Sequence, residues 1–226
     1  MTPRAAALHD ALGDALARIA GALQLPVLLL AMAVLVLCAL ELGRFATELW
    51  VRRTRLRRAG GLHALARRAL AQPAAAELIA RDAPTAFAAV AVCRAGAAVA
   101  AGRPAELEHA LADYELAAQR RLDRTRMLVR AGPALGLMGT LIPLAPGLAA
   151  LERGDVGALA ADLRVAFAAT VLGLLVGTVA FALTLARTRA YTEDLAALER
   201  AVAAAQPVAA VPSARRPRPH DEEARR

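Results

Sequence analysis

Two threonines stand where a polar side chain could do chemistry inside an apolar environment. Thr140 and Thr170 each lie in a long run of apolar and small residues that contains no charged side chain. A hydroxyl in such a run can hydrogen-bond water, an ion or a protonated acid, which would be a transport role. It can equally donate to a carbonyl one turn earlier in its own helix, which would be a structural role.

The histidines and cysteines form no catalytic or metal-binding pattern. Cys38 and Cys93 lie far apart in the sequence, and neither belongs to a spacing of residues that is typical of metal ligands. The four histidines are scattered, at His9, His63, His109 and His220. No glycine loop of the phosphate-binding type is present either. The sequence therefore predicts no enzyme, no metal site and no other cofactor.

The composition is that of a helical membrane protein. Of the residues, 58% are hydrophobic but only 3% are aromatic, so the apolar content is mainly alanine and leucine. Three runs, 25–43, 131–151 and 165–186, are each about 20 residues long, which suits a helix that crosses a bilayer. The first run could also be a signal peptide, but the preceding residues include Asp10 and Asp14 and no small-residue cleavage site follows. A retained span is therefore predicted.

The charge pattern predicts an orientation in the cell membrane. The net charge is +8 and the pI about 11.1, and arginines concentrate in residues 44–130 and after residue 187. The segment 152–164 is comparatively acidic. By the positive-inside rule, the N-terminus lies outside and the C-terminus in the cytoplasm. Nucleic-acid binding is not predicted, because the arginines form no patch with interleaved aromatic residues.

The remaining segments are predicted to be helical up to residue 205. The fold class is an all-α membrane protein with three transmembrane helices, long cytoplasmic helical extensions and a cytoplasmic helical bundle. In chain order the predicted segments are an external amphipathic helix (1–24), the first span (25–43), a cytoplasmic helical region (44–130), the second span (131–151), an external loop (152–164), the third span (165–186), a cytoplasmic extension (187–205) and a disordered tail (206–226). A structureless terminus is the alternative for 1–24.

Small residues recur at helical spacing on the second and third spans. Such stripes let helices pack closely or give a partner helix a smooth wall. The residues with this predicted helix-packing or partner-facing role are Gly132, Gly136, Gly139, Pro143 and Gly147 on the second span and Ala166, Gly173 and Gly177 on the third. Pro143 and Pro146 are also predicted to bend or loosen the second span.

Two segments resemble the signature of the MotA/TolQ/ExbB proton-channel family. They are GPALGLMGT (132–140) and AFAATVLGL (166–174), and the three-span layout resembles the TolQ/ExbB type. The resemblance implies a homo-oligomeric ring, typically a pentamer, around the single span of an ExbD/TolR/MotB-like partner. That partner would carry the ionisable aspartate. The resemblance also implies that Thr140 and Thr170 line a proton or sodium path.

The sequence departs from the family at Val165, where several relatives carry a glutamate. This departure keeps a second function open, a non-conducting membrane scaffold of the same fold. Glu41, near Arg44 at the end of the first span, is predicted to be a solvated or paired interface charge, not a proton carrier. Asp162 and Arg164 are predicted to form a simple pair at the end of the external loop.

Overall fold

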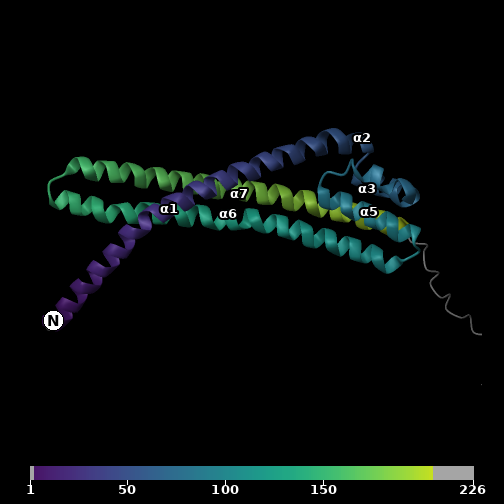
Figure 1. Cartoon of the computed structure of the whole chain (residues 1–226). Coiled ribbons are helices and arrows are strands. Elements are labelled where there is room, and N and C mark those ends of the chain that lie inside the picture. Colours follow the sequence, from purple (N-terminus) through teal and green to yellow (C-terminus); the bar gives the residue numbers. More distant parts are fainter. Residues whose placement is uncertain (1–2, 206–226) are drawn as a thin grey trace, which may run out of the picture. The chain divides into compact units, whose positions relative to one another are not determined.

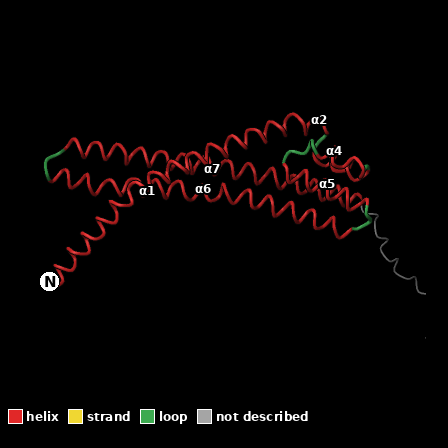
Figure 2. Tube along the Cα trace, viewed as in Figure 1, coloured by secondary structure: helices red, strands yellow, loops and turns green. Residues whose placement is uncertain are grey.

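The computed structural model describes the backbone of residues 3–205, and every element in that range is a helix or a short helical turn (Figure 2). The predicted disordered tail, 206–226, lies outside the described residues. The prediction of an all-α protein is confirmed.

Three of the helices are much longer than the others. They are α1 (Pro3–Val51), α6 (Pro104–Glu152) and α7 (Val156–Ala205). Each contains a window long and apolar enough to cross a membrane, and only 17%, 28% and 33% of the residues in these windows are buried. Side chains that are apolar and yet exposed fit a lipid environment. The described residues thus contain three long apolar helices that could span a membrane, as predicted.

Shorter elements connect α1 to α6. They are η1 (Arg52–Leu56, a π-helical turn), α2 (Arg57–Ala59), α3 (Leu62–Ala71), η2 (Pro73–Ala75, a 3₁₀ turn), α4 (Ala76–Ala80) and α5 (Ala86–Ala100). Glycines and prolines separate them, as the sequence predicted. Gly60 and Gly61, for example, adopt φ values of 78° and 94°, which side chains disfavour. The chain forms two compact units, residues up to 54 with 115–193 and residues 55–114 with 194 onward, and both α6 and α7 contribute to each.

The first unit contains α1 and the apolar stretches of α6 and α7. Figure 1 shows α6 (teal) and α7 (green to yellow) running antiparallel from the turn that joins them. All three helices contribute to a buried cluster that includes Val34, Cys38, Leu128, Val176 and Ala180. This cluster gives α1 its place beside the α6–α7 pair.

The connection between α6 and α7 is much shorter than the sequence predicted. The loop expected over 152–164 is limited to residues 153–155, and Val156 already begins α7. Gly154 turns the chain with a φ of 77°, and the Asp155 Oδ1 accepts a hydrogen bond from the Ala158 backbone N at 2.9 Å. Because this side chain satisfies a free amide at the helix start, α7 can begin directly after the turn.

One further boundary differs from the prediction. The segment 1–24 and the first span were separate elements in the sequence analysis, but α1 is one helix that continues through Pro26. The helix α6 is continuous across Pro143 and Pro146, and the bend predicted there stays a prediction. A proline in a helix removes one backbone hydrogen bond, and side-chain packing can compensate for that loss. The Pro143 side chain is among the most deeply buried in the described part of the chain.

The second unit is built on alanine. Ala69, Ala88 and Ala98 are completely buried, and these small side chains let α3, α4 and α5 pack closely. A Cβ atom placed on Gly96 of α5 would lie only 2.6 Å from the Ala76 Cβ of α4. The α4–α5 contact therefore depends on a residue without a side chain at position 96.

The ends of α6 and α7 complete this unit around one tyrosine. Tyr114 is 1% exposed, its ring centre lies 5.1 Å from that of Phe87, and its hydroxyl donates to the Asp194 Oδ2 at 3.4 Å. Arg94 on α5 also forms an ion pair with Asp113 on α6. The second unit therefore includes the beginning of α6 and the end of α7, while its identity with the predicted cytoplasmic bundle stays a prediction.

Candidate functional site

A very close helix contact in the first unit lies between α6 and α7. We call it the glycine seam and define it by Gly132, Gly136 and Gly139 on α6 and Gly173 and Gly177 on α7. A Cβ atom on Gly132 would lie 2.7 Å from the Gly173 carbonyl oxygen and 2.9 Å from the Gly177 nitrogen. A Cβ atom on Gly173 would lie 2.6 Å from the Gly132 carbonyl oxygen and 2.7 Å from the Gly136 Cα. These are backbone atoms that cannot rotate away, so the two helices touch backbone to backbone.

The contact between the two helices continues from the seam toward the α6–α7 turn. A Cβ atom on Gly139 would lie 2.6 Å from the Ala169 Cβ, and one on Gly147 would lie 3.2 Å from the Leu159 Cδ1. Ala166 is 2% exposed. The small residues thus lie between two helices of one chain, while their contact with a partner or another copy stays a prediction.

Both threonines of the predicted ion path hydrogen-bond within their own helices. The Thr140 Oγ1 donates to the Leu137 carbonyl at 2.7 Å, and the Thr170 Oγ1 donates to the Ala166 carbonyl at 3.3 Å. Both residues are partly exposed. Each hydroxyl oxygen keeps its acceptor capacity, so these bonds leave room for one more hydrogen bond from water or a protonated acid. The ion-path role of the two threonines stays a prediction.

Two further hydroxyls on α7 were missed by the sequence reasoning. Thr184 and Thr188 follow Thr170 by 14 and 18 residues, which places all three on one face of the helix. Both are half-buried, and their hydroxyls donate to the carbonyls of Ala180 and Thr184, at 2.7 and 2.8 Å. The four-residue spacing of Thr184 and Thr188 in the sequence could have indicated that they share a helix face with each other.

A buried ion pair joins the three long helices where the apolar stretches of α1 and α7 end. Arg187 on α7 is completely buried, and its Nη1 lies 2.7 Å from the Glu41 Oε2 on α1. The Glu41 side chain also accepts a hydrogen bond from Arg44 at 2.9 Å, and the Arg121 Nη2 on α6 lies 3.8 Å from it. We call Glu41, Arg44, Arg121 and Arg187 the arginine clamp.

The clamp decides between the two alternatives of the Glu41 prediction. Glu41 is paired, as expected, but it is 4% exposed and therefore not solvated. The Arg44 contact could be read from its i,i+3 spacing. The Arg187 contact spans 146 residues and has no signal in the sequence. The charged Glu41 carboxylate can be buried away from water because three arginines surround it.

A second polar network lies just beyond the clamp. The Tyr191 hydroxyl donates to the Glu48 Oε2 at 3.2 Å, and the Arg52 Nη2 lies 3.3 Å from the Glu48 Oε1. Burial, reinforced by the charge of Glu48, raises the pKa of Tyr191 to about 12. The phenol therefore stays protonated at neutral pH and acts as the hydrogen-bond donor.

The predicted pair of Asp162 and Arg164 does not form. Both residues lie in the first turns of α7, and no ion pair joins them among the described residues. The Asp162 side chain instead packs beside Gly147, where a Cβ atom would lie 3.4 Å from the Asp162 Cβ. Residues two apart on a helix point in different directions, which prevents the pair. Within residues 3–205, no group of three His, Cys, Asp or Glu residues is placed to hold a metal ion.

Three long apolar helices with a glycine seam define a multi-pass helical membrane protein. The sequence model of the MotA/TolQ/ExbB proton channel family matches residues 71–200, more than half of the chain, and includes both motif segments. The chain therefore belongs to the MotA/TolQ/ExbB proton channel family, as its motifs indicated. Comparison with curated proteins and with solved structures gave no significant match.

The glycine seam leads to a first prediction. Gly173→Leu should disrupt the α6–α7 contact, because a leucine side chain would collide with backbone atoms of Gly132 and Gly136. We expect a lower yield of assembled protein and a lower melting temperature in mild detergent, measured by size-exclusion chromatography and thermal unfolding. Gly43→Leu is the matched control, because no atom lies within 4 Å of a Cβ there. Equal loss in both variants would contradict a specific role of the seam.

The arginine clamp leads to a second prediction. Arg187→Met should destabilise the protein by about 3 kcal/mol, because it removes the closest partner of a buried carboxylate. Glu41→Met in the same chain should restore most of that loss, since neither charge then remains buried. Arg189→Met is the control, because Arg189 is exposed on the same helix. Chemical unfolding in detergent measures all three, and an Arg187→Met variant as stable as the control would exclude the clamp.

Proposed function

We propose that this chain is the ring-forming subunit of a proton- or sodium-driven energy transducer of the cell inner membrane. It would conduct ions together with a single-span ExbD/TolR/MotB-like partner. The observation that carries the proposal is the family match, which includes the apolar stretches of α6 and α7. The two family motifs lie on these stretches and are in contact at the glycine seam. The family is one of proton channels, not of enzymes.

The need for a partner follows from the charges. Moving one charge through 100 mV releases about 2.3 kcal/mol, and using it requires a group that can change charge within the membrane. The runs 131–151 and 165–186 contain no ionisable side chain. We therefore assign the ionisable aspartate to the partner, and to Thr140 and Thr170 the role of hydrogen-bonding water or the protonated acid.

A ring would use the exposed apolar faces of α6 and α7. Leu137, Leu141, Phe167 and Val171 are each 60% to 65% exposed in the single chain. Some of this surface would face lipid, and the rest would contact neighbouring copies. A homopentamer is the number we propose, by analogy with the family.

A non-conducting scaffold of the same fold is the second candidate. Val165 in place of a glutamate favours it, as do the threonine hydroxyls, which already hydrogen-bond within their helices. The scaffold would keep the seam and the ring but pass no ions. Flux measurements on the complete complex separate the two candidates.

The proposed orientation places residues 1–24 and the α6–α7 turn outside. The second unit and the continuation of α7 after residue 186 would then lie in the cytoplasm. The excess of arginine in residues 44–130 supports this orientation.

The orientation can be tested directly with reporters. Alkaline phosphatase inserted at Gly154 should be active, because we place the turn outside. The same enzyme fused after Arg121 should be inactive, and a fluorescent reporter there should fold. The reverse pattern would overturn the orientation while leaving the family assignment intact.

The ion path is tested by replacing both threonines. Thr140→Val with Thr170→Val nearly preserves volume and removes two hydroxyls, so assembly should persist while proton flux falls at least about tenfold. The measurement is flux in vesicles that contain this chain and its cognate partner, with oligomer yield by native mass spectrometry. A stable monomer in every mild condition would contradict the ring.

Thr178→Val is the matched control for the ion path. The Thr178 hydroxyl also donates to a carbonyl of its own helix, that of Leu174 at 2.9 Å, but Thr178 lies on another face of α7. Undiminished flux in the double variant would remove Thr140 and Thr170 from the path. Absence of flux in the unchanged complex under every driving force would favour the scaffold.

A further inference from the structure

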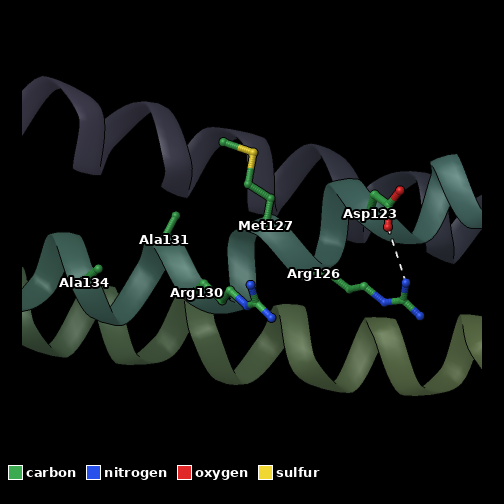
Figure 3. Close-up of a pocket in the computed structure, with 6 residues that line it drawn as sticks. All are labelled: Asp123, Arg126, Met127, Arg130, Ala131 and Ala134. Carbon is green, nitrogen blue, oxygen red and sulfur yellow. Dashed lines mark hydrogen bonds and ion pairs between the residues drawn. The ribbon is translucent and has the colours of Figure 1, made fainter.

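An open groove of about 650 Å³ lies on α6 where its charged part meets its apolar part (Figure 3). We call it the boundary groove. Its lining residues are Asp123, Arg126, Met127, Arg130, Ala131 and Ala134. Neither the seam nor the threonines contribute to it, so it is independent of the proposed conduction.

One side of the groove is cationic. Arg126 and Arg130 are four residues apart and extend from the same side of α6 (Figure 3). The Arg126 Nη1 lies 3.3 Å from the Asp123 Oδ1, and both side chains are more than half exposed. The Arg130 guanidinium has no acceptor among the described residues. The three side chains leave the groove a net charge of +1, which one phosphodiester group would balance.

The other side of the groove is apolar. The Met127 side chain is 67% exposed, and Ala131 and Ala134 follow at helical spacing toward the span. Leu137 and Leu141, 60% exposed each, extend the same apolar surface further along α6. A purely ionic ligand would leave this half of the groove without a partner.

The position of the groove along α6 indicates where the ligand comes from. Arg130 is the last charged residue before the uncharged run 131–151. The groove therefore lies at the edge of the hydrocarbon region, at the depth of the phospholipid headgroups. This statement holds for either orientation of the chain in the membrane.

We propose that the boundary groove binds an anionic phospholipid of the phosphatidylglycerol class. Arg126 and Arg130 hydrogen-bond the phosphate, and guanidinium groups match phosphate oxygens well in geometry and charge. One acyl chain lies along Met127, Ala131 and Ala134 toward the middle of the bilayer. Basic clefts at the membrane edge of transmembrane helices are suited to anionic headgroups, because nearby charge and apolar surface act together.

The test uses the full chain, delipidated in a neutral detergent, with lipid binding counted by native mass spectrometry and checked by thermal unfolding. We expect phosphatidylglycerol to bind at least about tenfold more tightly than phosphatidylcholine. Arg126→Gln with Arg130→Gln should abolish this preference. Arg120→Gln with Arg124→Gln should preserve it, because these exposed arginines have the same spacing on another face of α6.

Several outcomes would overturn the proposal. Inorganic phosphate that binds as tightly as the lipid would indicate a free-anion site, and equal binding of both lipids would exclude recognition of the anionic headgroup. If the unchanged chain shows no lipid preference and the Arg126→Gln with Arg130→Gln variant changes the oligomeric state, the two arginines instead contact a second copy of the chain.

Arg126→Lys with Arg130→Lys is the control against misfolding, and circular dichroism checks its helicity. This variant should keep a weaker preference for phosphatidylglycerol. Complete loss of the preference in a folded variant would contradict recognition by charge.

Discussion

The backbone contact between α6 and α7 is the constraint on which the rest of the first unit depends. Gly132, Gly136 and Gly173 bring main-chain atoms within a distance that no side chain would allow. Lipid tails are as apolar as leucine, so helices in a membrane gain little from hiding apolar surface. Close van der Waals packing is the main attraction left to them, and glycine maximises it. The two family motifs lie side by side along this seam.

The arginine clamp adds polar specificity to this apolar contact. Small residues can slide past one another at low cost, whereas Arg187 opposite Glu41 allows one position of α7 against α1. The clamp lies at the end of the apolar stretches, where α7 continues toward Tyr191. Packing thus sets how near the helices come, and buried charge sets where along their length they meet.

The functional proposals assign different chemistry to different depths of the membrane. Within the runs 131–151 and 165–186 the chain offers hydroxyls and a small-residue wall but no ionisable side chain, so the proposed conduction needs a carboxylate from another protein. At the boundary the chain offers guanidinium groups, some turned inward to Glu41 and others open to the surface at Arg126 and Arg130. The first kind holds helices together, and the second is available to lipid.

The sequence by itself determined the helical class, the three long apolar stretches, the small-residue stripes and the family, because hydropathy, helical spacing and local motifs are properties of neighbouring residues. It also located the breaks at Gly60 and Gly61. The short α6–α7 turn also had a local signal, because Asp155 caps the start of α7 by a contact with a residue only three positions away. Only the tertiary structure decided that Arg187 pairs with Glu41 and that Asp162 packs against Gly147. Both contacts depend on the register between distant helices, which local sequence patterns do not constrain.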